Sequence, residues 1–348
     1  MEIGPCQRRL SLNLLQQGEI GMRKILLCLG FLFALNLDVL HAEQIDYQSK
    51  FVPPENQVLL ILGQDTVAID DYVREIGIVP AGFTTYTSVY TAEGLYEPID
   101  RGAGNLYAKY VIDKYPDTVL QIGLYMVDAL DGVTAGDYDG SIDEIGRFIK
   151  ESKRPVYLRI GYEFDGDHNH YEPEKYIEAY RYIADRLRKN EVNNIAYVWH
   201  SFGHKMKTPV MDWYPGDEYV DWFAISFFSH KNKFIEDFVA LADGHKKPVM
   251  IAEATPAGIG VGYGRNAVKR YFEPFFKFVD EYGVKAICYI SCDWDSRPIY
   301  SDGSWKDGRV HANEQVKEFW MNEIKKEKYL QSSPGLFKIL GYEPVLSQ

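Results

Sequence analysis

Short apolar runs alternate with amphipathic stretches along the chain from about residue 57 onward. Each run has the length of one buried strand, and the alternation is the pattern expected when parallel strands are joined by crossover helices. Eight such strand and helix pairs follow one another. The predicted strands cover residues 57–64, 82–89, 119–127, 156–164, 194–201, 221–228, 248–254 and 286–294.

The helix after the fourth strand has the most regular spacing. Apolar residues recur at intervals of 3.6 from Tyr176 to Leu187, and Pro173 suits a first helical turn. Eight strand and helix pairs in roughly 300 residues predict an α/β fold, a single closed (β/α)8 TIM barrel, because an open doubly wound sheet ordinarily uses fewer strands. The predicted catalytic domain spans residues 43–348, and no linker or repeat indicates a second domain.

Composition narrows the class of partner. The chain of 348 residues is 46% hydrophobic and carries a formal net charge of −12. The apolar content is sufficient for a large core, whereas the acidic excess excludes a nucleic-acid partner, since affinity for a polyanion comes mainly from Lys and Arg. We expect a monomer that binds a neutral or cationic partner.

The beginning of the chain has the features of a secretory signal peptide. A basic pair at residues 23–24 precedes an apolar stretch at 25–35, and Ala42 is a small residue at a suitable cleavage position. The apolar stretch is too short to span a membrane. We predict that translation starts at Met22, that cleavage follows Ala42, and that the mature protein is secreted or periplasmic with no membrane contact. Residues 1–42 then form an N-terminal extension with its signal peptide.

Two cysteines remain after this extension, Cys288 and Cys292, both in the last predicted strand. Residues four apart on a strand are separated by about 13 Å, which is too far for a disulfide bridge. We therefore expect two buried free thiols.

Two glutamates stand at the ends of otherwise apolar strands. Glu163 ends the fourth predicted strand and Glu253 the seventh, and barrel enzymes have their chemistry at these carboxyl ends. A buried carboxylate costs several kcal/mol unless it has a partner. Such a pair supplies the acid and the base or nucleophile that glycoside hydrolysis requires. The alternative is that each glutamate forms a structural salt bridge, for example with Arg159 in the fourth strand.

Four segments, "RPVYLRIGYEFDG", "YVWHS", "DWYPGDEYVDWFAISFF" and "KPVMIAEATP", resemble glycoside hydrolase family 26 and its relatives in clan A. The resemblance extends from about residue 57 to 326, with the motifs in the family's order. It implies a barrel that cleaves internal β-glycosidic bonds of a polysaccharide with retention of configuration and without a cofactor or a catalytic metal. By this match Glu163 is the acid/base and Glu253 is the nucleophile.

The sequence departs from the family pattern at two places. Family mannanases usually have His immediately before the acid/base, where this chain has Tyr162. The tyrosine that clan members commonly place on strand six is replaced by Phe227 or Phe228, so a different residue must orient Glu253. The substrate is left open among β-1,4-mannan, β-1,3-xylan and β-glucan.

Further residues near the predicted strand ends are candidates for substrate contact. Trp294 offers a broad apolar surface for a sugar ring. Each of three more tryptophans, Trp213, Trp222 and Trp305, is a candidate either for sugar contact or for packing. The glycine-rich loop 258–265 is expected to line the groove, with Tyr263 or Arg265 in contact with substrate. The other predicted substrate-binding residues are Arg159, Tyr162, Asp165, His168, Trp199, His200, Phe228 and Asp293.

Two other functions are compatible with a barrel of this kind. A carbohydrate-binding barrel that has lost catalysis would bind polysaccharide without cleaving it. A metal-dependent hydrolase would use imidazole ligands from His168, His170, His200 and His204, but their spacing matches no ligand motif. A structural cation at Asp165 and Asp167 is also left open.

Overall fold

The computed structural model describes residues 47–204, 208–228 and 232–343. The predicted signal peptide and its cleavage site lie outside these described residues. Within them, every helix is too short or too polar to cross a membrane.

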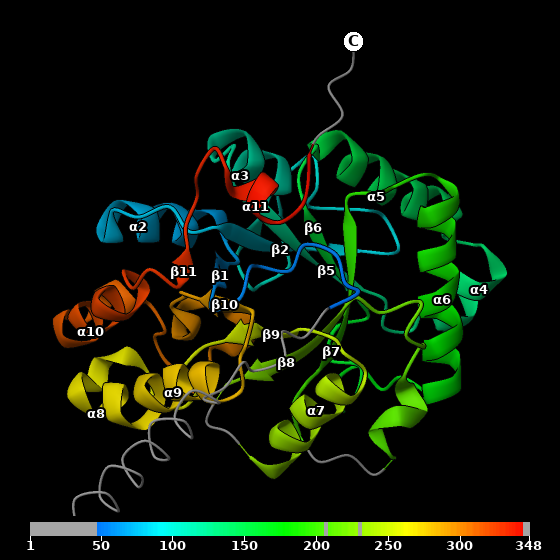
Figure 1. Cartoon of the computed structure of the whole chain (residues 1–348). Coiled ribbons are helices and arrows are strands. Elements are labelled where there is room, and N and C mark those ends of the chain that lie inside the picture. Colours follow the sequence, from blue (N-terminus) through cyan, green and yellow to red (C-terminus); the bar gives the residue numbers. More distant parts are fainter. Residues whose placement is uncertain (1–46, 205–207, 229–231, 344–348) are drawn as a thin grey trace, which may run out of the picture. The chain divides into compact units, whose positions relative to one another are not determined.

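Eight parallel strands form a closed barrel (Figure 1), which confirms the predicted fold. Neighbouring strands pair in chain order, and the last barrel strand pairs again with the first, Leu59 opposite Ala286 and Gly63 opposite Ile290. The barrel strands are β1 Val58–Gly63, β2 Gly82–Ser88, β5 Val119–Tyr125, β6 Val156–Ile160, β7 Ile195–Ser201, β8 Trp222–Phe227, β9 Val249–Ala254 and β10 Ala286–Ile290.

Helices surround the barrel on its outside (Figure 1). Seven of the eight predicted pairs have an α-helix, but the described residues between β7 and β8 contain a 3-10 helix, Val210–Trp213, instead. Short additional strands are β3 Ile99–Asp100, β4 Asn105–Leu106 and β11 Tyr329–Leu330. The α-helices are α2 Thr66–Ile76, α3 Ala108–Lys114, α4 Leu130–Ala135, α5 Asp139–Ser152, α6 Pro173–Lys189, α7 Lys233–Gly244, α8 Arg265–Ala267, α9 Glu273–Glu281, α10 Glu314–Ile324 and α11 Leu336–Ile339.

Side-chain alternation along each strand separates two cores. In β1, Leu60 and Leu62 pack outward against the helices, whereas Leu59 and Ile61 point into the barrel with Cys288. Helix α6 begins at Pro173 and buries Tyr176, Tyr180 and Leu187, so the predicted helix is confirmed. Cys288 and Cys292 are both buried and free, as predicted.

The amino-terminal end of the barrel is closed by residues from both ends of the described chain. Phe51 packs against Tyr157, whose hydroxyl donates to the Phe51 carbonyl over 2.7 Å. Leu336 and Leu340 belong to the same interior cluster, and α11 lies over the barrel in Figure 1. Because this end is filled, the carboxyl-terminal end is the one available for a ligand.

Two strands end four residues earlier than predicted. Strand β6 ends at Ile160 because Gly161 and Glu163 adopt positive φ values of 56° and 53°, which no strand accommodates. Glu163 therefore lies in a turn beyond the strand. Strand β10 ends at Ile290, and Trp294 begins a 3-10 helix, so its ring is held by a loop.

Strand β9 contains a β-bulge immediately before its functional residue. Ile251 pairs with Ile225 of β8, but the next pair joins Glu253 to Ser226, so β9 has one extra residue. The same irregularity appears against β10. Regular alternation would point Glu253 outward with Ile251, and the bulge turns it to the inside. Gln121 donates to the Ala252 carbonyl at the bulge over 2.9 Å.

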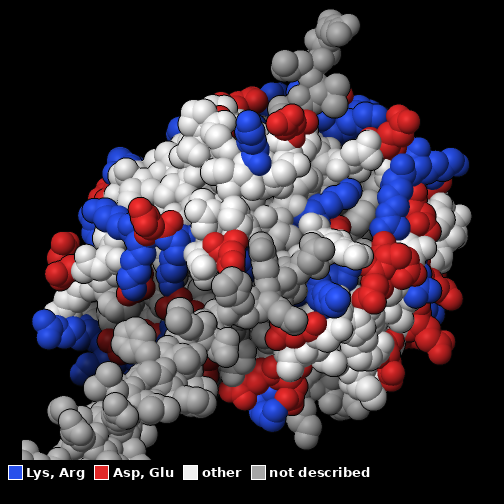
Figure 2. Space-filling view, in the orientation of Figure 1, with Lys and Arg blue, Asp and Glu red and all other residues white. Residues whose placement is uncertain are grey.

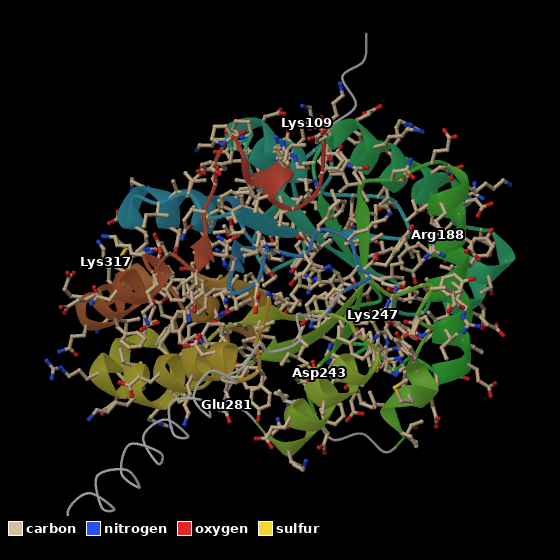
Figure 3. The ribbon with its side chains drawn as sticks, in the orientation of Figure 1. Lys109, Arg188, Asp243, Lys247, Glu281 and Lys317 are labelled. Atoms are coloured by element: carbon tan, nitrogen blue, oxygen red, sulfur yellow. The ribbon has the colours of Figure 1, made fainter. Side chains whose placement is uncertain are left out.

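Charged side chains lie mainly on the outside. Lys109, Arg188 and Lys317 are on the outer helices α3, α6 and α10 (Figure 3). On the face seen in Figure 2, basic and acidic side chains are intermixed around the margin. Opposite charges therefore offset one another on this face.

Candidate active site

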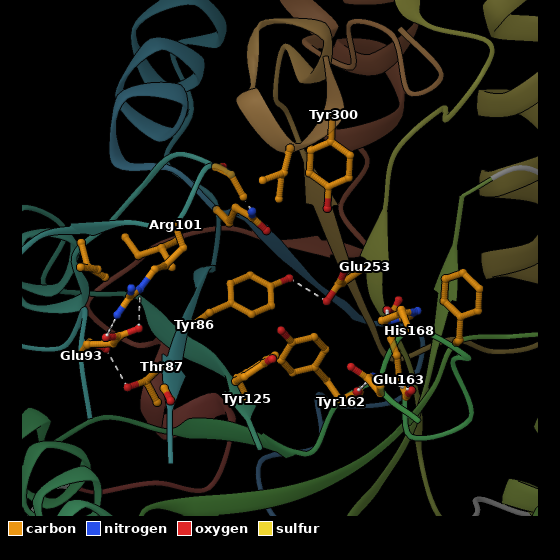
Figure 4. A pocket seen from close by; sticks show the side chains of 18 of the residues that line it. Tyr86, Thr87, Glu93, Arg101, Tyr125, Tyr162, Glu163, His168, Glu253 and Tyr300 are labelled. Carbon is orange, nitrogen blue, oxygen red and sulfur yellow. Dashed lines mark hydrogen bonds and ion pairs between the residues drawn. The ribbon is translucent and has the colours of Figure 1, made fainter. Parts of the chain in front are cut away.

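A cavity of about 860 Å³ opens at the carboxyl-terminal end of the barrel. Its lining residues lie at the ends of β2, β5 and β9 and in the segments that follow β1, β2, β6, β7, β8 and β10. Glu163 and Glu253 both line it and are drawn together in Figure 4. The predicted location of the glutamates at one rim is therefore correct.

Glu253 accepts two hydrogen bonds on the same oxygen. The Tyr86 hydroxyl donates to Oε1 over 2.6 Å, and the Arg159 guanidinium forms an ion pair with that oxygen. The Arg159 side chain is fully buried, and the Glu253 carboxylate balances its positive charge there. A cation and a phenol on one oxygen fix the orientation of Glu253.

Tyr86 and Arg159 reach Glu253 because the adjacent strand leaves room for them. A side chain at Gly123 of β5 would meet the Tyr86 ring at 2.5 Å and the Arg159 guanidinium at 2.9 Å. The guanidinium lies 4.9 Å from the centre of the Tyr86 ring and 5.3 Å from that of Tyr162. Two aromatic rings thus pack on this buried cation.

Glu163 has weaker partners. Ser226 donates to its Oε1 over 2.5 Å, and His168 Nε2 lies 3.0 Å from its Oε2. Burial and the nearby charge of Glu253 raise the pKa of Glu163 to about 6, against the lowering effect of these two hydrogen bonds. The hydrogen bond to Glu163 raises the pKa of His168 as well. The protonation of each of these two side chains therefore affects that of the other.

A chain of buried contacts links the two glutamates beneath the cavity. Arg159 Nη1 lies 3.3 Å from His200 Nδ1, and His200 Nε2 lies 3.0 Å from the Ser226 hydroxyl. Burial, and then the charge of Arg159, lower the pKa of His200 well below its usual range, so the ring is neutral. A guanidinium can only donate, so Nδ1 accepts and the proton is assigned to Nε2. His200 then donates to Ser226, which donates to Glu163.

The turn that carries Glu163 is fixed by its own hydrogen bonds. Asn169 Nδ2 donates to the carbonyls of Tyr162 and Glu163, each over 2.9 Å, and the Gly166 amide donates to the Glu163 carbonyl over 2.8 Å. Strained backbone of this kind persists only where surrounding contacts impose it, and it is concentrated at functional sites.

Six of the predicted site residues line the cavity: Tyr162, Glu163, His168, Phe228, Glu253 and Trp294. Trp294 is only 2% exposed, because Tyr300 and Trp305 pack on it at centroid distances of 4.8 and 5.3 Å. Its indole nitrogen donates to the Thr255 hydroxyl over 3.1 Å. Tyr300 and Trp305 share this wall of the cavity with Trp294, and contact between Trp294 and a sugar ring stays a prediction.

Two predicted substrate contacts lie beneath the cavity and contact the glutamates' partners. Arg159 and His200 are both fully buried, and neither lines the cavity. Their prediction as substrate-binding residues is wrong. Inward-pointing side chains below the end of a strand contact other core side chains, which separate them from a ligand in the cavity.

Three other predicted contacts are used elsewhere. Trp199 stacks on Phe164 at 4.7 Å in the outer core. Asp165 accepts from the Ser201 hydroxyl over 2.6 Å, and its pKa is raised to about 6 by burial. Asp293 pairs with Arg309 at 3.2 Å. None of the three lines the cavity. A substrate contact is wrong for the fully buried Trp199, and it stays a prediction for Asp165 and Asp293.

The structure also gives the positions of the three tryptophans whose role was undecided and of the glycine-rich loop. Trp213 and Trp222 are buried packing residues, whereas Trp305 lines the cavity beside Phe228. Loop 258–265 packs against the segment around Asp307, and its Tyr263 and Arg265 do not line the cavity. Contact between this loop and substrate stays a prediction.

The four histidines considered as metal ligands are in different surroundings. His170 pairs with Asp128 at 2.9 Å, whereas His204 stacks on the Phe202 ring and His168 meets the same ring edge to face. Within residues 47–204, 208–228 and 232–343, no three His, Cys, Asp or Glu side chains are grouped to hold a metal ion.

Sequence reasoning missed Tyr86, Ser226 and Tyr300. Tyr86 and Ser226 are polar residues on the inward face of β2 and β8, where alternation could have identified them. Tyr86 donates the hydrogen bond to Glu253 that clan members commonly obtain from a tyrosine on strand six. Tyr300 gives no such signal because it lies in an irregular loop after β10.

Curated relatives extend over most of the chain. A β-1,3-xylanase of a Vibrio species is 31% identical over 318 residues, which cover 83% of this chain and 69% of the relative. A β-1,3-xylanase of an Alcaligenes species is 30% identical over 322 residues, covering 84% and 68%.

Solved structures show the same fold at lower identity. A family 26 β-mannanase from Bacteroides ovatus superposes with a TM-score of 0.60 at 14% identity, covering 84% of this chain and 94% of that one. An endo-β-1,4-mannanase from Cellulomonas fimi gives a TM-score of 0.59 at 18% identity, covering 81% and 74%.

The sequence profile described as glycosyl hydrolase family 26 matches residues 116–286, a stretch that contains both cavity glutamates. The profile match lies within the barrel, and the two β-1,3-xylanase relatives extend over most of the chain. The chain belongs to glycosyl hydrolase family 26.

Proposed function

We propose that this glycoside hydrolase is an endo-acting, retaining β-1,3-xylanase, with Glu253 as nucleophile and Glu163 as acid/base. The observation that carries the assignment of roles is the difference between the partners of the two glutamates. Glu253 contacts a cation and a phenol, whereas Glu163 has a raised pKa of about 6 and neutral or titratable partners.

In the first step Glu253 attacks the anomeric carbon while Glu163 protonates the departing oxygen. Tyr86 and Arg159 both bind Oε1 of Glu253, so the attack is assigned to Oε2. Ser226 donates to Oε1 of Glu163, so the acidic proton is assigned to Oε2, on the side of His168. The bond to the leaving sugar breaks and a glycosyl ester forms on Glu253.

In the second step Glu163, now ionised, removes a proton from water as the water attacks the ester. The Ser226 hydrogen bond stabilises the carboxylate produced by the first step. The neutral His200, held by Arg159, keeps the serine hydrogen directed at Glu163. His200 and Ser226 are thus positioning residues for the acid/base.

The choice of β-1,3-xylan among β-linked polysaccharides follows the two relatives that carry that activity in their names. The mannanases resemble this chain in fold at under 20% identity, and Tyr162 stands where family mannanases have His. These two differences favour xylan over mannan.

The test is hydrolysis of a panel of polysaccharides by the purified protein: β-1,3-xylan, β-1,4-xylan, β-1,4-mannan and mixed-linkage β-glucan. We expect release of short xylo-oligosaccharides from β-1,3-xylan, with the β-anomer appearing first in proton NMR. The Glu253→Ala variant is the control for a contaminating enzyme. Faster cleavage of mannan would contradict the substrate, and binding without cleavage would contradict the enzyme assignment.

We also propose that residues 1–42 are removed during export and that residues 43–348 act as a secreted or periplasmic monomer. The basis is the basic and apolar pattern at residues 23–35. Amino-terminal sequencing and light scattering of exported protein test both points. A mature protein that retains residues 25–35 would contradict cleavage.

A further inference from the structure

Strand β9 turns two successive residues toward the inside of the barrel. Ala252 belongs to the interior cluster and Glu253 lines the cavity, whereas Ile251 and Ala254 on either side pack in the outer core. A regular strand alternates its side chains between two faces, so this inward pair is a direct consequence of the bulge. A residue that stabilises the bulge therefore affects the position of the Glu253 carboxylate.

We propose that Gln121 is a positioning residue for the nucleophile and that it acts through the main chain of Ala252. Gln121 lies on β5 and is fully buried. Its strand neighbours Leu120 and Ile122 pack in the outer core, so Gln121 points into the barrel. It does not line the cavity, so it does not touch substrate. This role rests on the proposed function, in which Glu253 attacks the anomeric carbon.

The Ala252 carbonyl accepts a hydrogen bond from Gln121 Nε2 over 2.9 Å. Strands β5 and β9 are not neighbours in the barrel, so this bond crosses its interior. The ladder pairs of β9 omit Ala252 on both sides, since Ile251 is followed by Glu253 against β8 and by Ala254 against β10. A buried carbonyl without a donor is costly. In a regular ladder this carbonyl would point at a neighbouring strand, so the Gln121 bond favours the bulged conformation.

The orientation of the Gln121 amide follows from its two partners. A carbonyl oxygen can only accept, so the amide nitrogen must face Ala252. The same Nε2 donates to the Thr84 hydroxyl over 3.0 Å, and Thr84 is directly opposite Gln121 on β2. Gly63 of β1 leaves room for Thr84, because a side chain there would meet Thr84 Cγ2 at 2.0 Å. Both amide hydrogens therefore have an acceptor, and the side chain is held in one orientation.

Glu253 is therefore held at both ends. Tyr86 and Arg159 bind Oε1 at the tip of its side chain, and the Gln121 bond fixes the main chain immediately before it. The tip contacts orient the carboxylate, whereas the main-chain bond sets the point from which the side chain extends. Reacting atoms must lie about 3 to 3.5 Å apart, and a misplacement of about 1 Å can cost about 10² in rate. Loss of the Gln121 bond should therefore slow the chemical step.

The experiment replaces Gln121 by methionine, which has a similar length and no hydrogen-bond donor. Gln121→Met should lower the maximal single-turnover rate of aryl release from an aryl β-1,3-xylobioside about 10- to 100-fold. The half-saturating concentration should change by less than about twofold, because Gln121 does not line the cavity. Circular dichroism checks that the variant folds.

Gln331→Met is the matched control. Gln331 Nε2 also donates to a main-chain carbonyl, that of Ile324, over 3.0 Å, and Gln331 does not line the cavity either. This variant loses the same kind of hydrogen bond at a place with no connection to Glu253. Its single-turnover rate should equal that of the intact protein, and an equal loss in both variants would overturn the positioning role.

A second measurement separates positioning of the nucleophile from a general loosening of the site. In Glu253→Ala with added azide, the external nucleophile replaces the carboxylate, so the position of residue 253 no longer affects the attack. Gln121→Met should therefore cause no further loss of azide-supported turnover in that background. As large a loss there as in the otherwise intact protein would overturn the role of Gln121, and so would an unchanged rate in the otherwise intact protein. If Gln121→Met does not fold, Gln121→Asn, which keeps the amide but is too short to reach Ala252, is judged by the same outcomes.

If the intact protein releases no aryl group, it is the proposed function that fails. Crystal structures of the intact protein and of the folded Gln121 variant then test the geometry alone. We expect the Ala252 carbonyl to turn toward a neighbouring strand in the variant and the Glu253 carboxylate to shift by about 1 Å. Superposable main chains at Ala252 and Glu253 in the two proteins would overturn the positioning role.

Discussion

The surroundings of Glu253 and of Glu163 differ although both are buried carboxylates in one cavity. Glu253 is held by Arg159 and Tyr86 from below. Glu163 contacts Ser226 and the half-exposed His168. A permanent cation favours a carboxylate at every pH, whereas neutral donors permit a proton to come and go. The comparison shows that two buried carboxylates in one cavity can have partners of different charge.

The largest expected effect is the loss of the nucleophile. Glu253→Ala should lower kcat by a factor on the order of 10⁴ or more, because no covalent intermediate can form. Added azide should restore turnover by attacking directly and give a product of inverted configuration, observed by NMR. A retained product would assign the nucleophile to Glu163.

Loss of the acid/base should depend on the leaving group. Glu163→Ala should reduce activity on polysaccharide by about 10² to 10⁴, the range for general acid catalysis. The first step should be nearly normal for an aryl glycoside whose leaving group needs no proton, and azide should then accelerate the second step with retention. The measurement is burst kinetics with both substrates, and equal losses on both would contradict the role.

A substitution at Tyr86 tests the hydrogen bond that orients the nucleophile Glu253. Tyr86→Phe removes the hydroxyl that donates to Glu253 but keeps the ring against Arg159. A hydrogen bond to a charged group contributes about 1.5 to 3 kcal/mol, so kcat should fall about 10- to 150-fold. Tyr263→Phe, at an exposed position, is the control. An unchanged kcat would mean that Arg159 alone orients Glu253.

The dependence of kcat/KM on pH tests the hydrogen bond from Ser226 to the acid/base Glu163. The acid must be protonated in the free enzyme, so kcat/KM should fall above a pH of about 6, the pKa of Glu163. Ser226→Ala removes a donor that favours the carboxylate, so this basic limb should move upward by roughly half to one pH unit. Ser304→Ala, an exposed serine, should leave the profile unchanged. A downward movement would contradict the assignment.

The smallest expected effect concerns stability. A pKa raised from 4.5 to about 6 means that the folded state holds the Glu163 proton more tightly than the unfolded state. The stability this contributes is fully present below pH 4.5 and is lost as pH rises through 6, by about 2 kcal/mol. The free energy of unfolding of Glu163→Gln, measured with urea, should therefore increase by that amount relative to the intact protein as the pH is raised from 4 to 7. An unchanged difference would indicate an unperturbed carboxyl.

The sequence by itself determined the barrel, the order of its strands, helix α6 and the two glutamates, because these depend on local periodicity and on where polar residues interrupt apolar runs. It also indicated that something other than a strand-six tyrosine must orient Glu253. It could not identify Tyr86 as that residue, because Tyr86 and Glu253 are 167 positions apart in the chain.

Only the tertiary structure decided which inward residues meet ligand and which meet one another. Arg159 and Glu163 are four positions apart, yet one is sealed under the cavity and the other lines it. The turn at Gly161 separates them, and the bulge in β9 turns Glu253 inward against simple alternation. Both depend on pairing with neighbouring strands, and the pattern of one strand carries no information about its neighbours' register.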